Sequence, residues 1–211
     1  EELKRRIFDT FPTQNRAVTR ADYENVVYRM SPQFGSIARC SVQTDPDSAK
    51  RNLNMYVIST DQQGKLIKTN STIKNNLKTW LDQYRMINDT VDIFDPFILN
   101  LGLEFVIQAA VGVDKFVLLE RAIETLRRKY NTHFYIGEAF YISDVYSELK
   151  KVPGILDVVK VKLVNKEGSN YSGVQIDINS NLSPDGTYFI VPKNAILEFK
   201  FPQTDITGKV R

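Results

Sequence analysis

Cysteine and histidine are almost absent from the sequence, which contains one of each, Cys40 and His133. A single cysteine cannot form a disulfide within the chain, and one cysteine with one histidine cannot build the usual Cys/His metal cluster. The glycines are few and fall singly, so no glycine-rich loop is present that would wrap a phosphate with backbone amides. These absences indicate a reduced or redox-indifferent protein and leave nucleotide binding by a glycine loop without support.

The sequence also lacks a long apolar run. No stretch approaches the roughly 18 consecutive apolar residues of a membrane span. The charged start, 1–6, has no apolar core of the kind found in signal peptides. There is no initiator Met, and the last residues are Lys209-Val210-Arg211. We therefore expect a piece cut from a longer polypeptide by a trypsin-like protease.

A marked excess of one charge sign is missing as well. The 28 Lys and Arg residues are nearly balanced by 25 Asp and Glu residues, and the formal net charge is +3. Domains that bind nucleic acids normally have a pI above about 9 and basic residues clustered on one face. The balance therefore does not indicate a nucleic-acid partner. With 42% hydrophobic and 25% charged residues in 211, the composition is typical of globular proteins and leaves one domain or two open.

Four segments have the apolar spacing of an amphipathic helix. The first begins at the cap residue Thr19, has Asp22 in its first turn and ends before Pro32 and Gly35. The third has Asp114 as its cap and a basic last turn, which suits the negative end of the helix dipole. Its expected apolar face consists of Phe116, Leu119, Ile123, Leu126 and Tyr130. The helices are expected over 19–30, 72–86 (capped by Asn70 or Ser71), 115–130 and 144–152 (capped by Ser143).

Alternation of apolar and polar residues between turn residues predicts the strands. The longest, 97–111, has its odd-numbered residues on an apolar face, and its length predicts a bend or bulge at Gly102. Further strands are expected over 37–42, 53–59, 90–94, 155–164, 174–178, 188–191 and 196–201.

The order of these elements predicts an α+β fold with mixed or antiparallel sheets and about four helices, rather than a wound parallel sheet. We expect an elongated body with two or more small subdomains. The expected parts are a linker or the tail of a preceding helix at 1–13, a first α+β subdomain at 14–113, a helical and strand subdomain at 114–165, and a β-rich C-terminal part at 166–211.

No group of polar residues has the pattern of a catalytic or metal site. His133 follows a helix without the partners of a Ser/His/Asp or Cys/His site, and we interpret it as a surface or cap histidine. Cys40 lacks the electropositive setting of a reactive thiolate and is interpreted as a small core residue. Asp89, Asp92 and Asp95 alternate between strand faces and are interpreted as a solvated edge. We predict no catalytic residue, no cofactor and no metal.

Basic clusters support a second hypothesis. They are Arg127-Arg128-Lys129, Lys150-Lys151, and Lys160, Lys162 and Lys166, of which the last group has the spacing to line one strand face and contact phosphates. However, Glu148, Asp157 and Glu167 lie among them, and no platform of stacking aromatic residues is visible. A solvated or interfacial face is the favoured interpretation, and a nucleic-acid-binding α+β domain stays the alternative.

Two groups of short motifs resemble a known family. Asn15-Arg16-Ala17-Val18-Thr19, followed by Asp22-Tyr23, is similar to the run that enters the first helix in the baseplate J-like family of contractile-tailed phages. The later Ile136-Gly137, Ile142-Ser143 and Val152-Pro153-Gly154-Ile155 resemble the second signature of that family, an Ile-Gly followed by a short helix and a Pro-Gly or Gly-Val stop.

Order and spacing add to this resemblance. With Asn88-Asp89 and the strand after it, the motifs span about residues 12–165, while the strands after 165 match nothing as clearly. In its details the chain is most similar to the baseplate wedge proteins of T4-like phages.

The resemblance implies a structural subunit of a tail baseplate, of which this chain is part of the C-terminal half. Such proteins form a ring around the central hub, pair with copies of themselves, bind other wedge proteins and take part in the rearrangement on sheath contraction. It implies no catalytic residue, small-molecule substrate or membrane contact, and a place in the virion after assembly in the host cytoplasm. Tyr135, Phe140, Tyr141 and the basic faces of 115–130 and 155–166 become candidate contact surfaces, because interfaces favour aromatic residues and Arg.

Overall fold

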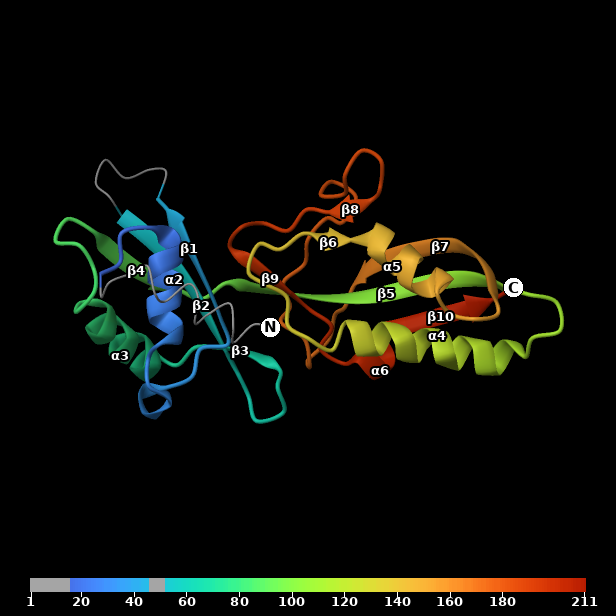
Figure 1. Ribbon diagram of the computed structural model, residues 1–211, viewed down its shortest axis with the longest axis horizontal. Coiled ribbons are helices and arrows are strands. Elements are labelled where there is room, and N and C mark those ends of the chain that lie inside the picture. Colours follow the sequence, from blue (N-terminus) through green and yellow to red (C-terminus); the bar gives the residue numbers. More distant parts are fainter. Residues whose placement is uncertain (1–15, 46–51) are drawn as a thin grey trace. The chain divides into compact units, whose positions relative to one another are not determined.

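The computed structural model describes residues 16–45 and 52–211 and has two compact units, Glu1–Pro96 (unit 1) and Phe97–Arg211 (unit 2) (Figure 1). The described residues form two four-stranded sheets, one two-stranded sheet and five α-helices, one of which has only four residues. These elements confirm the predicted α+β class, the mixed and antiparallel sheets and the number of substantial helices. The expected linker at 1–13 and most of the expected turn at 45–48 lie outside the described residues.

In unit 1, two helices pack against one face of a sheet whose central strand is β2. This strand pairs antiparallel with β1 and β3 and parallel with β4. Leu53, Met55 and Val57 alternate along β2 and are buried in one cluster with Tyr23 and Leu77 of the helices. The elements are α2 (Arg20–Tyr28), the 3-10 helix η2 (Pro32–Phe34), β1 (Arg39–Thr44), β2 (Asn52–Thr60), β3 (Leu66–Lys68), α3 (Ser71–Leu81) and β4 (Thr90–Phe94).

The start of α2 is fixed by a capping box. The Thr19 hydroxyl accepts from the N–H of Asp22 at 3.2 Å, and the Asp22 carboxylate accepts from the N–H of Thr19 at 2.7 Å. Burial raises the pKa of Asp22, but hydrogen bonds from Thr19 and Val18 outweigh it, and the net pKa is lowered. This contribution to stability is therefore present above the unfolded-state pKa of about 3.9 and is lost as the pH falls through the folded-state value.

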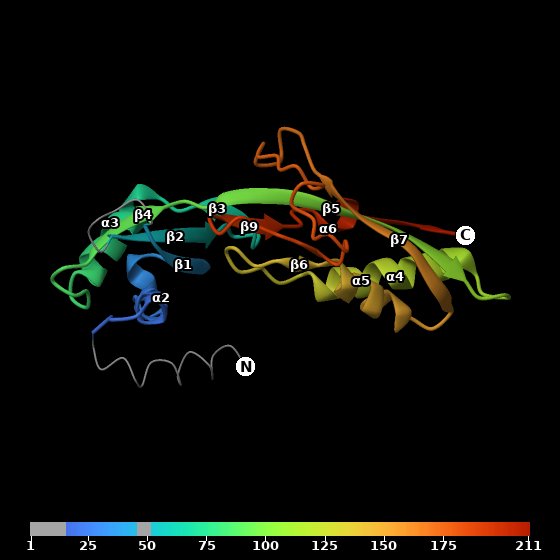
Figure 2. The ribbon, with the colours of Figure 1, turned by 90° about the horizontal axis from the view of Figure 1, so that it is seen from above.

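Unit 2 contains a second sheet in the order β10-β5-β7, with β9 pairing to the first residues of β5. Helices α4 and α5 lie on the same side of this sheet, and the chain leaves β7 on the other side (Figure 2). Further along the same segment, Ile176, Ile178 and Leu182 pack against the core. The elements are β5 (Phe97–Ala109), α4 (Lys115–Lys129), β6 (Phe140–Tyr141), α5 (Ile142–Lys150), β7 (Ile155–Asn165), β8 (Tyr188–Phe189), β9 (Ala195–Glu198), α6 (Pro202–Asp205) and β10 (Ile206–Val210).

The predicted alternation of the central strand β5 is confirmed from Leu103 to Gln108, where Leu103, Phe105 and Ile107 are buried and Glu104 and Gln108 are exposed. It is wrong at both ends, because every residue from Leu99 to Leu103 is buried, and because the strand ends at Ala109 and leaves Val111 fully exposed. The predicted bulge at Gly102 is wrong, because Gly102 pairs in register with Val164. A Cβ at this position would lie 2.2 Å from Lys166 Cε, so Gly102 permits a close approach. The irregularities occur later, between Val106 and Ile107 and between Gln108 and Ala109.

Three further predictions, of a helix end, a helix cap and a strand, are wrong because contacts with distant parts of the chain determine the structure there. Helix α3 ends at Leu81 rather than at residue 86, and the carbonyl of Tyr84 accepts from the N–H of Ala17 instead. Ser143 does not cap α5, because its N–H donates to the carbonyl of Thr187 beside the β6–β8 pair and the helix begins one residue earlier. The segment 174–178 alternates in burial as predicted but forms no ladder.

Helix α4 has the predicted cap and start, and it ends at Lys129, one residue before the predicted end. Most of the predicted face is confirmed: Leu126 is buried, and Leu119, Ile123 and Tyr130 are partly buried and pack against the core. Leu118 and Ala122, which were not predicted, are buried as well. Phe116, expected in the core, is 86% exposed because it lies in the first turn, before the residues that reach the core.

The outer edge of β7 is partly covered by α5. The N–H of Val161 donates to the Tyr146 hydroxyl at 3.1 Å. Lys160 and Lys162 stand on either side of Val161 and are exposed.

We predict that Gly208→Ala destabilises unit 2 by about 1–3 kcal/mol, as overpacking does. A Cβ at Gly208 in β10 would lie 2.4 Å from Phe105 Cζ and 2.9 Å from Leu119 Cδ1. Urea unfolding monitored by circular dichroism measures the loss. Thr207→Ala, at the exposed neighbouring position, is the control and should change stability by no more than about 0.5 kcal/mol. Equal stability of the two variants would contradict this packing argument.

Candidate interaction surfaces

Cys40 and His133, the two side chains weighed for catalysis in the sequence, belong to different units. Cys40 is 6% exposed in the core of unit 1, as predicted, and its pKa is raised well above the usual range by burial and by the charge of Glu24. A thiol with such a pKa stays protonated near neutral pH and is a poor nucleophile. In the described part of the chain, no three His, Cys, Asp or Glu residues are grouped so that they would hold a metal ion.

His133 lies in unit 2, half-buried beside a cavity of about 220 Å³ that Glu138 and Asp144 also line. Burial, and then the charges of Asp144 and Glu148, raise the pKa of Tyr130 in the cavity wall, so its phenol stays protonated. Pockets that bind small molecules usually measure about 300–1,000 Å³. This hollow is smaller than that range.

An aromatic cluster forms one wall of this cavity. The rings of Tyr130, Phe134, Phe140 and Phe199 have centroids 5.3 to 6.1 Å apart in every pairing, in tilted, stacked and edge-to-face arrangements. Phe140 was expected to be exposed, but it is 1% exposed. The prediction for Phe140 is therefore wrong, because the other three rings enclose it.

Tyr135 and Tyr141 are exposed, as expected for contact residues, at 47% and 51%. Tyr141 lies beside Tyr188, with centroids 5.9 Å apart across the β6–β8 pair. Tyr135 and Tyr141 both line the cavity, and we call these two side chains the aromatic surface.

The three predicted edge carboxylates have three different environments. Asp89 is 1% exposed and accepts a hydrogen bond from the buried Tyr23 hydroxyl at 2.7 Å. Asp95 pairs with Lys74 at 2.7 Å, and Asp92 is exposed. The interpretation as a solvated edge is wrong for Asp89, because the side chain joins the loop after α3 to α2.

The basic clusters of α4 and α5 are held by local partners. Arg127 donates to the carbonyls of Pro202 and Gln203 at 3.0 and 2.8 Å. Glu148 accepts from Lys129 at 3.0 Å and from Lys151 at 2.9 Å, and these bonds lower its pKa. Carboxylates that already pair with the lysines reduce the positive potential that a phosphate backbone would meet.

Lys160 and Lys162 of β7 share one strand face, as predicted, whereas Lys166 of the same predicted group lies just beyond the end of the strand. Lys162 lies opposite Glu104, and Lys160 lies opposite Val106. On the other side of β5, Lys209 of β10 lies opposite the same Val106, which puts its Cα about 10 Å from that of Lys160. The sequence did not reveal Lys209 as a member of this group, because β10 is short and its pairing partner lies far back in the chain.

Comparisons with known proteins give a likeness in fold. By sequence, the chain matches no protein-family model and no curated protein. By structure, it is similar to a chain in a cryo-EM structure of the anti-feeding prophage (AFP) baseplate, 6-fold symmetrised, with a TM-score of 0.55 and 12% identity. The alignment covers 87% of this chain and 38% of that chain. No helix among the described residues is long and apolar enough to cross a membrane.

The pair Tyr23 and Asp89 generates a testable prediction. Asp89→Ala leaves the buried Tyr23 hydroxyl without this acceptor and should destabilise unit 1 by about 1–3 kcal/mol. Asp92→Ala, at an exposed position of the neighbouring strand, is the matched control and should cost no more than about 0.5 kcal/mol. Chemical denaturation monitored by Trp80 fluorescence measures both. If the two variants lose the same stability, Asp89 has no special role in holding α2.

Proposed function

We propose that this chain is part of a structural subunit in the baseplate of a contractile tail, a wedge protein of the kind that the sequence motifs resemble. The single observation that carries the proposal is the likeness in fold to a chain of the anti-feeding prophage baseplate over 87% of this chain. This chain spans 38% of the length of that one, so a longer subunit is the unit of function. At 12% identity the likeness concerns the fold, and the motifs supply the second argument.

The geometry supports a scaffolding role. The buried carboxylates of unit 2 are tied to structural partners: Glu198 accepts from Asn100, and Asp205 accepts from the Tyr171 hydroxyl and from the N–H of Phe201. The exposed tyrosines are side chains that protein interfaces favour. We therefore propose that the subunit is not an enzyme, and that it lies in the virion tail after assembly in the host cytoplasm.

The proposed partners are copies of the same subunit and other wedge proteins. A closed ring needs either one heterologous contact or two alternating ones, so more than one surface of the subunit is in use. In this proposal the ring surrounds the hub and rearranges when the sheath contracts.

Assembly with other tail proteins tests the function. The full-length subunit, mixed with the other baseplate proteins of its own tail, should form rings or wedges visible by negative-stain electron microscopy. The same mixture without the subunit is the control and should not form them. Absence of any assembly contradicts the proposal, and salt-sensitive retention of the chain on DNA or RNA favours the nucleic-acid alternative.

Self-association is predicted for the isolated chain. Sedimentation velocity should show species larger than the 24.2 kDa monomer at high micromolar concentration. Tyr135→Ser should weaken the association if the aromatic surface makes the contact, whereas Ile67→Ser, a control of similar exposure (44% against 47%) in the β2–β3 hairpin, should not. A monomer at every concentration shows that this part of the subunit does not make the self-contact.

A further inference from the structure

One end of unit 2 exposes an unusual number of large apolar side chains. Val111 is fully exposed, Phe116 is 86% exposed and Leu156 is 66% exposed. Isolated exposed apolar residues are ordinary, but several at one place mark an interaction site. We define the tip surface as these residues with the partly exposed Val113 and Val117.

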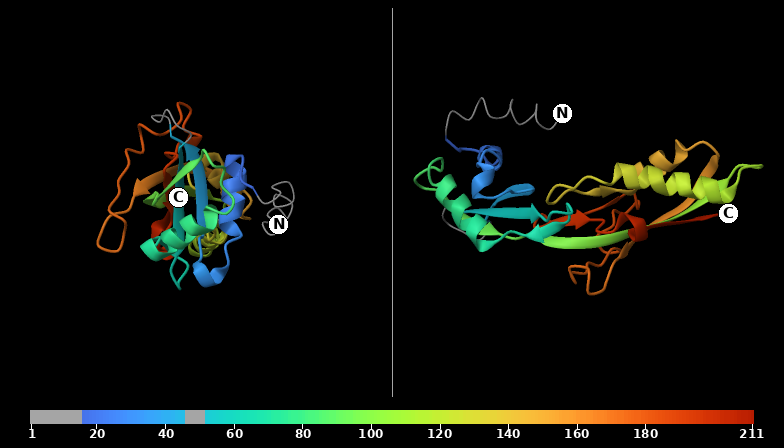
Figure 3. Two further views of the ribbon diagram at one scale, coloured as in Figure 1. Left: turned by 90° about the vertical axis from the view of Figure 1, so that its left-hand side faces the viewer. Right: turned by 90° about the horizontal axis from the view of Figure 1, so that it is seen from below.

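The segments that carry the tip surface are joined by backbone hydrogen bonds. The N–H of Ala110, in the β5–α4 loop, donates to the carbonyl of Gly154, in the α5–β7 loop, at 2.9 Å. A Cβ at Gly154 would lie 3.2 Å from Val113 Cγ1, so the two loops are in close contact. The N–H of Ala109 donates to the carbonyl of Arg211 at 3.2 Å, which brings the last residue to the same end (Figure 3).

The fold holds the two largest of these side chains outward. In the ladder between β5 and β7, Gln108 pairs with Asp157 and Ala109 with Ile155, so Leu156 is the extra residue of a bulge. A bulge redirects a side chain, and here it exposes a leucine. Phe116 follows the N-cap Asp114, whose carboxylate accepts from the N–H of Phe116 at 2.8 Å. Because the backbone is already fixed at both positions, a contact there costs less ordering entropy.

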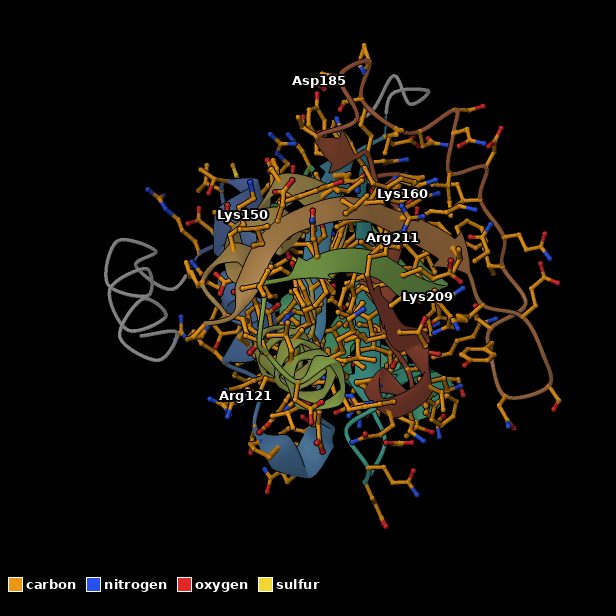
Figure 4. All side chains as sticks on the ribbon, turned by 90° about the vertical axis from the view of Figure 1, so that its right-hand side faces the viewer. Arg121, Lys150, Lys160, Asp185, Lys209 and Arg211 are labelled. Carbon is orange, nitrogen blue, oxygen red and sulfur yellow. The ribbon has the colours of Figure 1, made fainter. Side chains whose placement is uncertain are left out.

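Basic side chains outnumber acidic ones at this end of unit 2. Segments 110–117, 148–157 and 209–211 contain five Lys and Arg residues and three Asp and Glu residues. Asp114 caps α4, and Asp157 pairs with Lys150 at 3.3 Å. Glu148 pairs with Lys151 at 2.9 Å, which leaves Lys115, Lys209 and Arg211 as the basic side chains of these segments without an ion pair among the described residues. Figure 4, which looks onto this end, labels Lys150, Lys209 and Arg211.

We propose that the tip surface docks a different polypeptide, through a helix that has an apolar face and acidic flanks. Complementary charge favours an acidic partner. Pairing of two copies through the tip would bring two basic rims together, so a second copy is disfavoured at this end. The inference rests on the proposed function in one respect, since that function supplies the neighbouring subunits that would carry such a helix.

A designed peptide tests the chemistry directly. The probe is a helix of about 18 residues, five turns, with Leu at i, i+3, i+4 and i+7 and Glu on its other faces. A second probe has Lys in place of every Glu. Titrated into the ¹⁵N-labelled chain, the acidic probe should shift the amide signals of 110–117 and 153–157. It should bind about tenfold or more tightly than the basic probe and should weaken in high salt.

Two variants distinguish specific binding at the tip surface from nonspecific binding of the probe elsewhere on the chain. Phe116→Gln should weaken binding of the acidic probe about tenfold or more, because large aromatic anchors dominate such contacts. Ile190→Gln is the matched control, since Ile190 is 48% exposed in unit 2 but outside the tip segments, and it should leave binding unchanged. Both side chains are largely in solvent, so neither variant should lose the fold.

Each other outcome overturns the inference. No binding at millimolar probe, equal binding of the two probes, or signal shifts confined to other segments shows that the tip is not an acidic-helix site. Concentration-dependent shifts of the tip signals without probe identify a second copy as the occupant. The peptide experiment does not depend on baseplate assembly, so the two proposals can fail separately. If the subunit forms rings but does not bind the acidic probe, the tip-surface proposal is wrong. If the chain binds the acidic probe but the subunit forms no rings, the baseplate proposal is wrong.

Discussion

Unit 2 depends on a single strand, β5, which is shared by three partners. Its first residues pair with β9, its later residues pair with β10 on one side and with β7 on the other, and its odd-numbered residues form the core beneath α4 and α5. Each fully buried leucine, isoleucine or phenylalanine of this row contributes about 1.5–3 kcal/mol. The neighbouring strand must approach closely for this, which explains why Gly208, beside the Phe105 ring, leaves no room for a Cβ.

The residues of the motifs that resemble a family hold the fold of this structure together. Thr19 and Asp22 cap α2, the N–H of Ala17 bonds to the loop after α3, and Tyr23 reaches Asp89. The Pro-Gly stop before β7 supplies Gly154 with a φ of 99°, a conformation that side chains rarely adopt. The fold requires such residues regardless of what its surface binds. The motifs therefore support a fold in common with the family that they resemble, and they do not identify the binding partner.

Features that depend on residues close together in the sequence could be predicted from it, whereas features that depend on residues far apart in the sequence could not. The caps Thr19 and Asp114 and the bounds of β4 followed from nearest neighbours along the chain. The burial of Asp89 did not, because its partner Tyr23 lies 66 residues away. Phe116 continued the apolar spacing of its helix, yet a spacing rule cannot tell where a helix extends beyond the core it covers. The segment 174–178 had the right alternation, but the side-chain amide of Asn165, rather than a strand, bonds to the carbonyl of Ile176.

The hydroxyl of Tyr146 on the edge of β7 has a consequence for any structure that crowds copies of this chain together. A bare edge strand invites another chain to add itself by backbone pairing, and such growth has no natural end. Here the N–H of Val161 is already taken, and the flanking Lys160 and Lys162 repel an identical edge. Growth through this edge is therefore disfavoured, and contacts between copies through side-chain surfaces are favoured, which close into a ring where the rotation between neighbours allows it.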